Sequence, residues 1–151
     1  MKKFRFPLRS VATVRSLAEL RARERFSAAV HAFLESERRL GEIRARLRQL
    51  EERMRAGRGH TFRGAEQAAF LAEFSQETVL ATKTEAEVAE ARSALEIARH
   101  AWLESRRDVR VIENLETKAR RAHSVEVERE NQAAMDDRAS ALAARAAAKA
   151  S

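Results

Sequence analysis

A seven-residue repeat of apolar side chains, interrupted at one glycine-rich stretch, constrains the fold of this chain more than any other feature. In the second half the repeat occupies Phe74, Ala81, Val88, Leu95, Trp102 and Val109. In the first half it occupies Phe26, Phe33, Leu40, Leu47 and Met54. Three of the four glycines lie between the two repeats, in GRGHTFRG from Gly57 to Gly64. Because a helix with such a repeat buries its apolar stripe against another helix, the sequence predicts two long helices joined by a glycine turn.

The composition favours the same architecture. Charged residues make up 35% of the 151 residues, aromatic residues make up 5%, and Pro7 is the one proline, a residue tolerated in the first turn of a helix. Such a chain is typical of long helices with a thin seam between them. We therefore predict an all-α fold, an antiparallel two-helix coiled-coil hairpin with an overhanging C-terminal helix. It forms a single domain over 1–151, with helix one over about 7–56, a loop over 57–64 and helix two over about 65–145.

Folding the two helices back symmetrically about the glycine stretch predicts which residues face each other. Phe26 then lies opposite Leu95, and Arg44 lies opposite Glu77, so that one polar layer pairs its charges. Helix two has no partner from helix one beyond Arg121. Two helices that each associate with other chains are the alternative to this hairpin.

Three large aliphatic residues fall beside the seam in this register. The second seam position of helix one is predicted to hold Val30, Glu37, Arg44 and Glu51. Ile43 and Leu50 then lie on the same flank as Leu80 of helix two. Two interpretations stay open for this flank: a widened edge of the core, or an exposed apolar strip that docks a partner.

The sequence offers no pattern for catalysis or metal binding. It has no cysteine, and no two of its histidines are three or four residues apart on a helix: His31, His60, His100 and His123. Catalytic and phosphate-binding motifs are also missing from the sequence. We predict that the chain is not an enzyme and has no catalytic, cofactor-binding or metal-binding residues. The opening MKKFRFPLRSVATVR has no apolar run, so no secretory signal is expected.

The net charge of +7 admits nucleic acid, anionic lipid or an acidic protein as a partner. The arginines that alternate over 21–25 and over 44–48 spread over different faces of a helix. A nucleic-acid site would instead gather its cations on one face. The pattern therefore disfavours nucleic acid, although a basic coiled-coil arm that binds RNA or DNA remains an alternative function. A structural scaffold that self-associates through the Ile43, Leu50 and Leu80 flank is another.

The two ends of the chain resemble the flagellar export protein FliJ family. KKFRFPLRSVATVRSLAE is similar to the basic, Phe-x-Phe-x-Leu start of that family. VRVIENLETKARRAHSVEVERENQAAMDDRA is similar to its second half, with Met135–Ala139 in place of an L-D-E-x-A-like ending. The resemblance implies a cytoplasmic coiled coil, peripheral to the inner membrane, built like the rotary stalk of F- and V-type ATPases. Its implied partners are a hexameric export ATPase, the cytoplasmic domain of the export gate membrane protein, and export chaperones.

The resemblance also implies which surfaces make contacts. The end that carries both termini would enter the ATPase ring, and Phe4, Phe6 and Leu8 are expected to pack near Ile112 and Leu115. The residues expected to contact the ring are Phe4, Phe6, Arg106, Arg107, Val111, Arg120 and Arg121. The flank of Ile43, Leu50 and Leu80 is expected to bind the gate or a chaperone. Whether a flagellar or a virulence-type export system is served stays open at this point.

Overall fold

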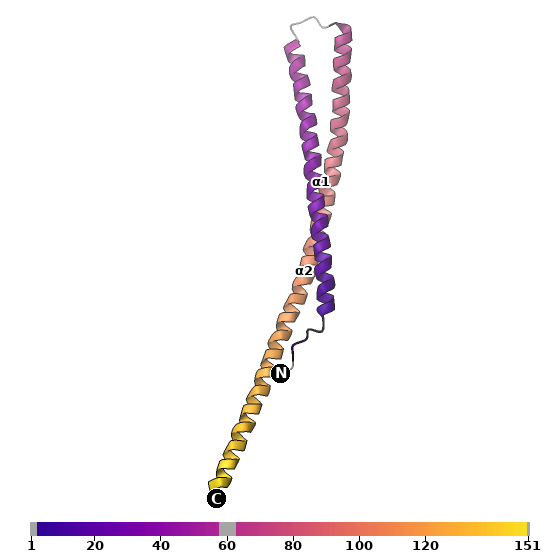
Figure 1. The fold of residues 1–151 in the computed structure, drawn as a ribbon. Coiled ribbons are helices and arrows are strands. Elements are labelled where there is room, and N and C mark those ends of the chain that lie inside the picture. The colour runs from indigo at the N-terminus through magenta and orange to yellow at the C-terminus, as the bar shows by residue number, and fades with distance from the viewer. Residues whose placement is uncertain (1–2, 58–62, 151) are drawn as a thin grey trace. The chain divides into compact units, whose positions relative to one another are not determined.

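A computed structural model describes residues 3–57 and 63–150 of the chain. It consists of two helices, α1 (Arg9–Ala56) and α2 (Gly64–Ala150), which run antiparallel to each other (Figure 1). Within the described residues there is no strand. The predicted all-α helical hairpin is therefore confirmed.

The chain divides into two compact units, and both helices contribute to each of them. The terminal unit contains Met1–Ala18 and Ser105–Ser151, and the hairpin unit contains Glu19–Glu104. We describe each unit by itself.

The helix boundaries differ from the predicted ones by a few residues. α1 begins at Arg9 because Pro7 and Leu8 form a turn, in which the amide of Arg9 donates to the carbonyl of Phe6 (3.3 Å). α2 begins at Gly64 and continues to Ala150, beyond its predicted end. Most of the predicted loop 57–64 lies outside the described residues.

In the hairpin unit, the predicted seam of α2 is confirmed. Ala81, Thr84 and Val88 are buried, and the other seam positions from Phe70 to Trp102 are half-buried. They alternate three and four residues apart, as the antiparallel packing of two helices requires.

In α1, one of the two predicted seam positions is wrong. The apolar repeat of Phe26, Phe33 and Leu40 does face α2, but its companions come three residues after each member rather than four. These companions are Ala29, Ser36, Ile43 and Leu50, all buried or half-buried, whereas Glu37, Arg44 and Glu51 are exposed. Small and aliphatic side chains fit into the seam, and charged side chains stay in water. Ser36 is only 2% exposed, and its buried hydroxyl is satisfied because it donates to the carbonyl of Phe33 (2.8 Å).

The predicted register is also wrong. Phe26 stacks on Trp102, with ring centroids 5.3 Å apart, instead of lying opposite Leu95. Glu77 accepts a hydrogen bond from Arg46 (3.1 Å), and Arg44 pairs with Glu85 (3.2 Å) instead. Both changes shift α1 toward later residues of α2, so the register departs from the one that a symmetric turn predicts.

In the terminal unit, the seam residues of α2 are Val109, which is half-buried, and Ile112, which is 5% exposed. Phe6 is 8% exposed, but Leu8 and Leu115 remain exposed at 37% and 42%, so the predicted packing of this cluster is only partly correct. From residue 128 to residue 150 every side chain of α2 is exposed. The predicted C-terminal overhang of this helix is therefore present.

Candidate protein-binding surfaces

The described residues before α1 form an irregular segment that ends in a turn, residues 3–8, which we call the N-terminal strap. Phe6 is buried. The ring of Phe4 meets the ring of His123 edge-on, with centroids 5.5 Å apart, and the guanidinium of Arg120 lies over the Phe4 ring at 4.9 Å from its centroid. Edge-to-face aromatic pairs and cation–π contacts of this kind are individually weak but directional. The strap is thus fixed to α2 by side chains.

A carboxylate on α2 connects the start of α1 to this cluster. Glu116 accepts from Arg9 at 3.5 Å and from Arg120 at 2.8 Å. Its side chain is 21% exposed, whereas Arg9 is 66% and Arg120 is 58% exposed. Further along α1, Arg15 donates to the carbonyl of Asp108 (3.2 Å). Glu116 is therefore the partly buried anchor between two arginines that reach it from solvent.

The structure brings together some of the predicted ring-contact residues. Phe4, Phe6 and Arg120 belong to the strap and its contact surface. Val111 is 51% exposed and lies off the seam, as predicted. The remaining predicted residues are exposed on α2: Arg106, Arg107 and Arg121.

Sequence reasoning missed three members of the strap cluster, namely Arg9, Glu116 and His123. Two of them carry a signal in the heptad repeat. Glu116 lies seven residues after Val109, and His123 lies seven residues after Glu116, so both continue the seam of α2. Polar residues at two consecutive heptad positions show that the apolar repeat of α2 ends after Val109.

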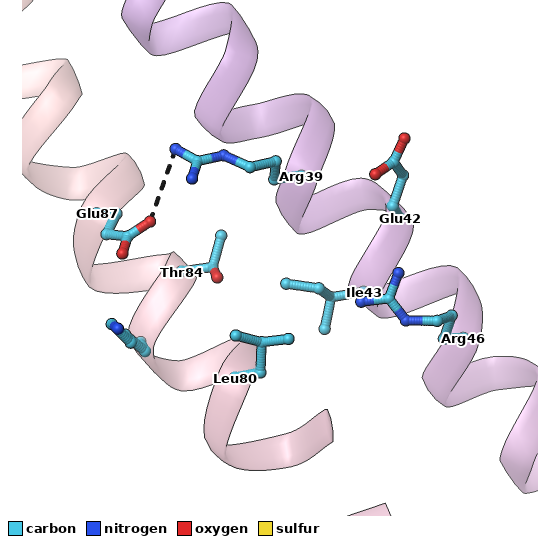
Figure 2. Close-up of a pocket in the computed structure, with 8 residues that line it drawn as sticks. Arg39, Glu42, Ile43, Arg46, Leu80, Thr84 and Glu87 are labelled. Atoms are coloured by element: carbon cyan, nitrogen blue, oxygen red, sulfur yellow. Dashed lines mark ion pairs between the residues drawn. The ribbon is translucent and has the colours of Figure 1, made fainter. Parts of the chain in front are cut away.

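In the hairpin unit, a groove lies between the two helices and holds part of the predicted apolar flank (Figure 2). Ile43 of α1 points toward Leu80 and Thr84 of α2. Ile43 and Leu50 are 4% and 2% exposed, so the interpretation of these two residues as an exposed docking strip is wrong. They lie in the seam because the second seam position of α1 comes one residue earlier than predicted. Leu80, at 40% exposure, is the flank residue that solvent reaches.

Charged side chains surround this apolar floor. The residues that line the groove are Arg39, Glu42, Ile43, Arg46, Leu80, Lys83, Thr84 and Glu87. Arg39 pairs with Glu87 (3.7 Å) across the groove, and Arg46 pairs with Glu77. Small-molecule pockets are lined mainly by apolar and aromatic groups. A lining in which charged residues outnumber apolar ones is better suited to contact with another protein than to binding a small molecule.

An exposed network of charges lies on α1 beside this groove. Arg38 binds both Glu35 and Glu42, one helical turn to either side. The hydrogen bond from Arg38 lowers the pKa of Glu35, and the positive charge of Arg38 acts in the same direction. The two carboxylates in turn raise the pKa of Arg38, which stays fully charged.

The described residues offer neither a metal site nor a membrane-spanning helix. Among residues 3–57 and 63–150, no three acidic or histidine side chains gather as a metal site would require. In the same residues no helix is apolar enough over a sufficient length to span a membrane.

Comparison with known proteins agrees with the resemblance seen at the two ends of the chain. The family model described as "Flagellar FliJ protein" matches residues 4–148. No curated protein and no solved structure gives a significant match. Because the matched region includes both helices and nearly the whole chain, the protein belongs to the FliJ family and is a component of the flagellar export apparatus.

Proposed function

We propose that this protein is a non-enzymatic stalk and adaptor of flagellar export. In this proposal the terminal unit inserts into the ring of the hexameric export ATPase and couples it to the export gate. The protein also delivers chaperone-bound substrates, and its place is the cytoplasm, at the membrane-bound export apparatus. Family membership supports the setting, and the contacts themselves are the proposal.

The overhang of α2 is the observation that most favours insertion into a partner. Residues 128–150 are exposed on every side and would extend roughly 35 Å at 1.5 Å per residue. A single helix of this kind gains no stability from packing within the chain. It therefore offers a long, slender surface to a surrounding partner.

The charge of the overhang indicates how it would be held. After Asp137 the sequence contains Arg138, Arg145 and Lys149 but no acidic residue. At 3.6 residues per turn these three cations lie within about 40° of one another around the helix. The opposite side is formed by alanine and serine, which allow close approach. A channel that carries carboxylates on one side would complement this helix.

The test is to add the purified protein to the cognate export ATPase and measure ring assembly and ATP turnover. We expect the full-length chain to raise both. A chain truncated after Val127 should lose the effect while keeping its hairpin, because the side chains of residues 128–150 are all exposed. The triple substitution Arg138→Ala, Arg145→Ala and Lys149→Ala is the matched control that keeps the helix but removes the charge. If the full-length chain changes neither quantity, the proposed stalk function is wrong.

For the gate or chaperone contact, we propose the groove around Leu80. Its apolar floor is partly open to solvent, and charged side chains of both signs surround it: Arg39, Arg46, Lys83, Glu42 and Glu87. Leu80→Asp should abolish binding of the gate domain or of a chaperone in a pull-down. The same variant should still stimulate the ATPase, because Leu80 belongs to the hairpin unit and the overhang to the terminal unit. If Leu80→Asp binds the gate domain and the chaperones as well as the wild-type chain does, this assignment of the groove is wrong.

A further inference from the structure

Several residues that the proposed stalk function would need to present are buried or engaged where the N-terminal strap lies on α2. Phe6 is 8% exposed, Phe4 is half-buried, and Arg120 is engaged with both Phe4 and Glu116. We infer that the strap is a releasable, autoinhibitory cover, which occupies the seam of α2 in the free protein and leaves it when this end engages the ATPase ring. This inference rests on the proposed function.

The strap lies where a helix would otherwise be expected. The seam of α2 continues past Ile112 through Glu116, Ala119 and His123, all of which are half-buried. α1 begins at Arg9, so the strap of residues 3–8 reaches the later part of this seam in place of a helix. Phe4 reaches it at His123. The strap thus occupies a surface that can accept another chain.

The contacts that hold the strap are suited to release. Arg9 and Arg120 are both more than half exposed, and ion pairs in such surroundings contribute little stability. The strap itself carries Lys3 and Arg5, both exposed, and approaches a part of α2 that contains Arg120 and Arg121. Like charges repel, so this arrangement opposes the burial of the two phenylalanines. A seam lined only by apolar residues has no such electrostatic repulsion.

Release would change the chemistry of the terminal unit in one step. It would uncover both phenylalanines, and would free the Arg120 guanidinium from the Phe4 ring. The uncovered surface combines aromatic side chains with arginine. Such surfaces are typical of the central contacts in protein interfaces. The cover keeps them from solvent until a partner is present.

Absence of native cysteine makes a reversible lock straightforward. The double substitution Lys3→Cys and His123→Cys keeps both phenylalanines and places one thiol beside Phe4, whose ring centroid lies 5.5 Å from that of His123. A short bifunctional thiol reagent with a cleavable disulfide would fix the strap, and reduction would free it within the same protein. Helicity measured by circular dichroism before and after cleavage verifies that both forms are folded. The two single-cysteine variants, treated with a monofunctional reagent, control for modification alone.

The affinity of each form for the cognate export ATPase is then measured by titration. We expect the locked form to bind at least tenfold more weakly than the reduced form, because a protein whose binding-competent state is suppressed loses affinity in proportion. Equal affinity of the locked and reduced forms would overturn the inference and leave the stalk function standing. If neither these forms nor the wild-type chain binds, the stalk function itself fails and the inference falls with it.

Discussion

Glu77 is a charged residue at a seam position of α2, and its replacement by leucine should stabilise the protein. Its side chain is 20% exposed. Arg46 donates to Oε1 (3.1 Å), but Oε2 is buried and has no hydrogen-bond partner within the described part of the chain. A buried carboxylate oxygen without a partner lowers stability, because it has lost water and gained nothing in exchange. Glu77→Leu removes this oxygen and adds an apolar side chain to the seam.

The expected gain in the free energy of unfolding is about 1–2 kcal/mol. Full burial of a leucine side chain contributes about 1.5–3 kcal/mol, and this position is about four-fifths buried. The ion pair lost on substitution offsets part of this, although Arg46 is 46% exposed and can be solvated again. Replacement of buried ion pairs by apolar residues ranges from neutral to a gain of about 1–4 kcal/mol, and the expected value lies within this range.

The measurement is urea unfolding followed by the fluorescence of Trp102, the one tryptophan in the sequence. Trp102 lies in the same unit as Glu77, stacks on Phe26 and donates to Glu19 (2.9 Å), so it reports on the hairpin unit. The control is Glu85→Leu, which removes an ion pair whose carboxylate side chain is 52% exposed and should change stability by about 0.5 kcal/mol or less. Light scattering verifies that the oligomeric state is unchanged, since an added seam leucine can recruit another chain. An unchanged or lower unfolding midpoint for Glu77→Leu would refute the reasoning.

Two further predictions concern burial in the hairpin unit and the charge network around Arg38 on α1. Leu50→Asp should lower the free energy of unfolding by more than about 3 kcal/mol, because it places a carboxylate in a site that is 2% exposed. Leu80→Asp, at a position that is 40% exposed, should lower it by about 1 kcal/mol or less. Thermal melts followed by circular dichroism compare the stabilities of the two variants. Arg38→Ala should raise the pKa of Glu35 toward its ordinary value, as followed by NMR titration of the carboxyl carbon. Because the folded-state pKa of Glu35 is lowered, the stability from this pair is present above the pKa of the unfolded chain and is lost as pH falls through the folded value. If the difference in free energy of unfolding between wild type and Arg38→Ala does not change with pH across the range in which Glu35 titrates, this prediction is wrong.

The seam of α2 could be predicted from the sequence, and that of α1 only in part, for a physical reason. Phe26, Phe33 and Leu40 fix one seam position by size alone. The second position could come three or four residues later, and this turn does not decide between them, because Ala29 and Val30 are both half-buried. The informative residues lie further on, where Ile43 and Leu50 are large and seven residues apart. Burial of these two residues places the second seam position of α1 three residues after the first.

The register could not be obtained from the turn. Moving one helix by about a turn past the other leaves apolar positions facing apolar positions, so the thin seam tolerates several alignments. Specific pairs distinguish them, including Arg46 with Glu77, Arg44 with Glu85, and the stacking of Phe26 on Trp102. A long arginine side chain reaches more than one glutamate on the facing helix, so charge matching in the sequence alone does not select one register.

The terminal unit combines a regular repeat with an irregular partner. Val109, Glu116 and His123 keep the seven-residue spacing, yet the last two are polar, and what reaches His123 is the strap, not a helix. An apolar seam here would hold a continuous helix tightly and permanently. A polar seam contacted by Phe4 and by exposed arginines offers weaker, more solvated contacts, as the inferred release of the strap requires. The same residues that make this end hard to predict from periodicity are therefore those that would let it exchange partners.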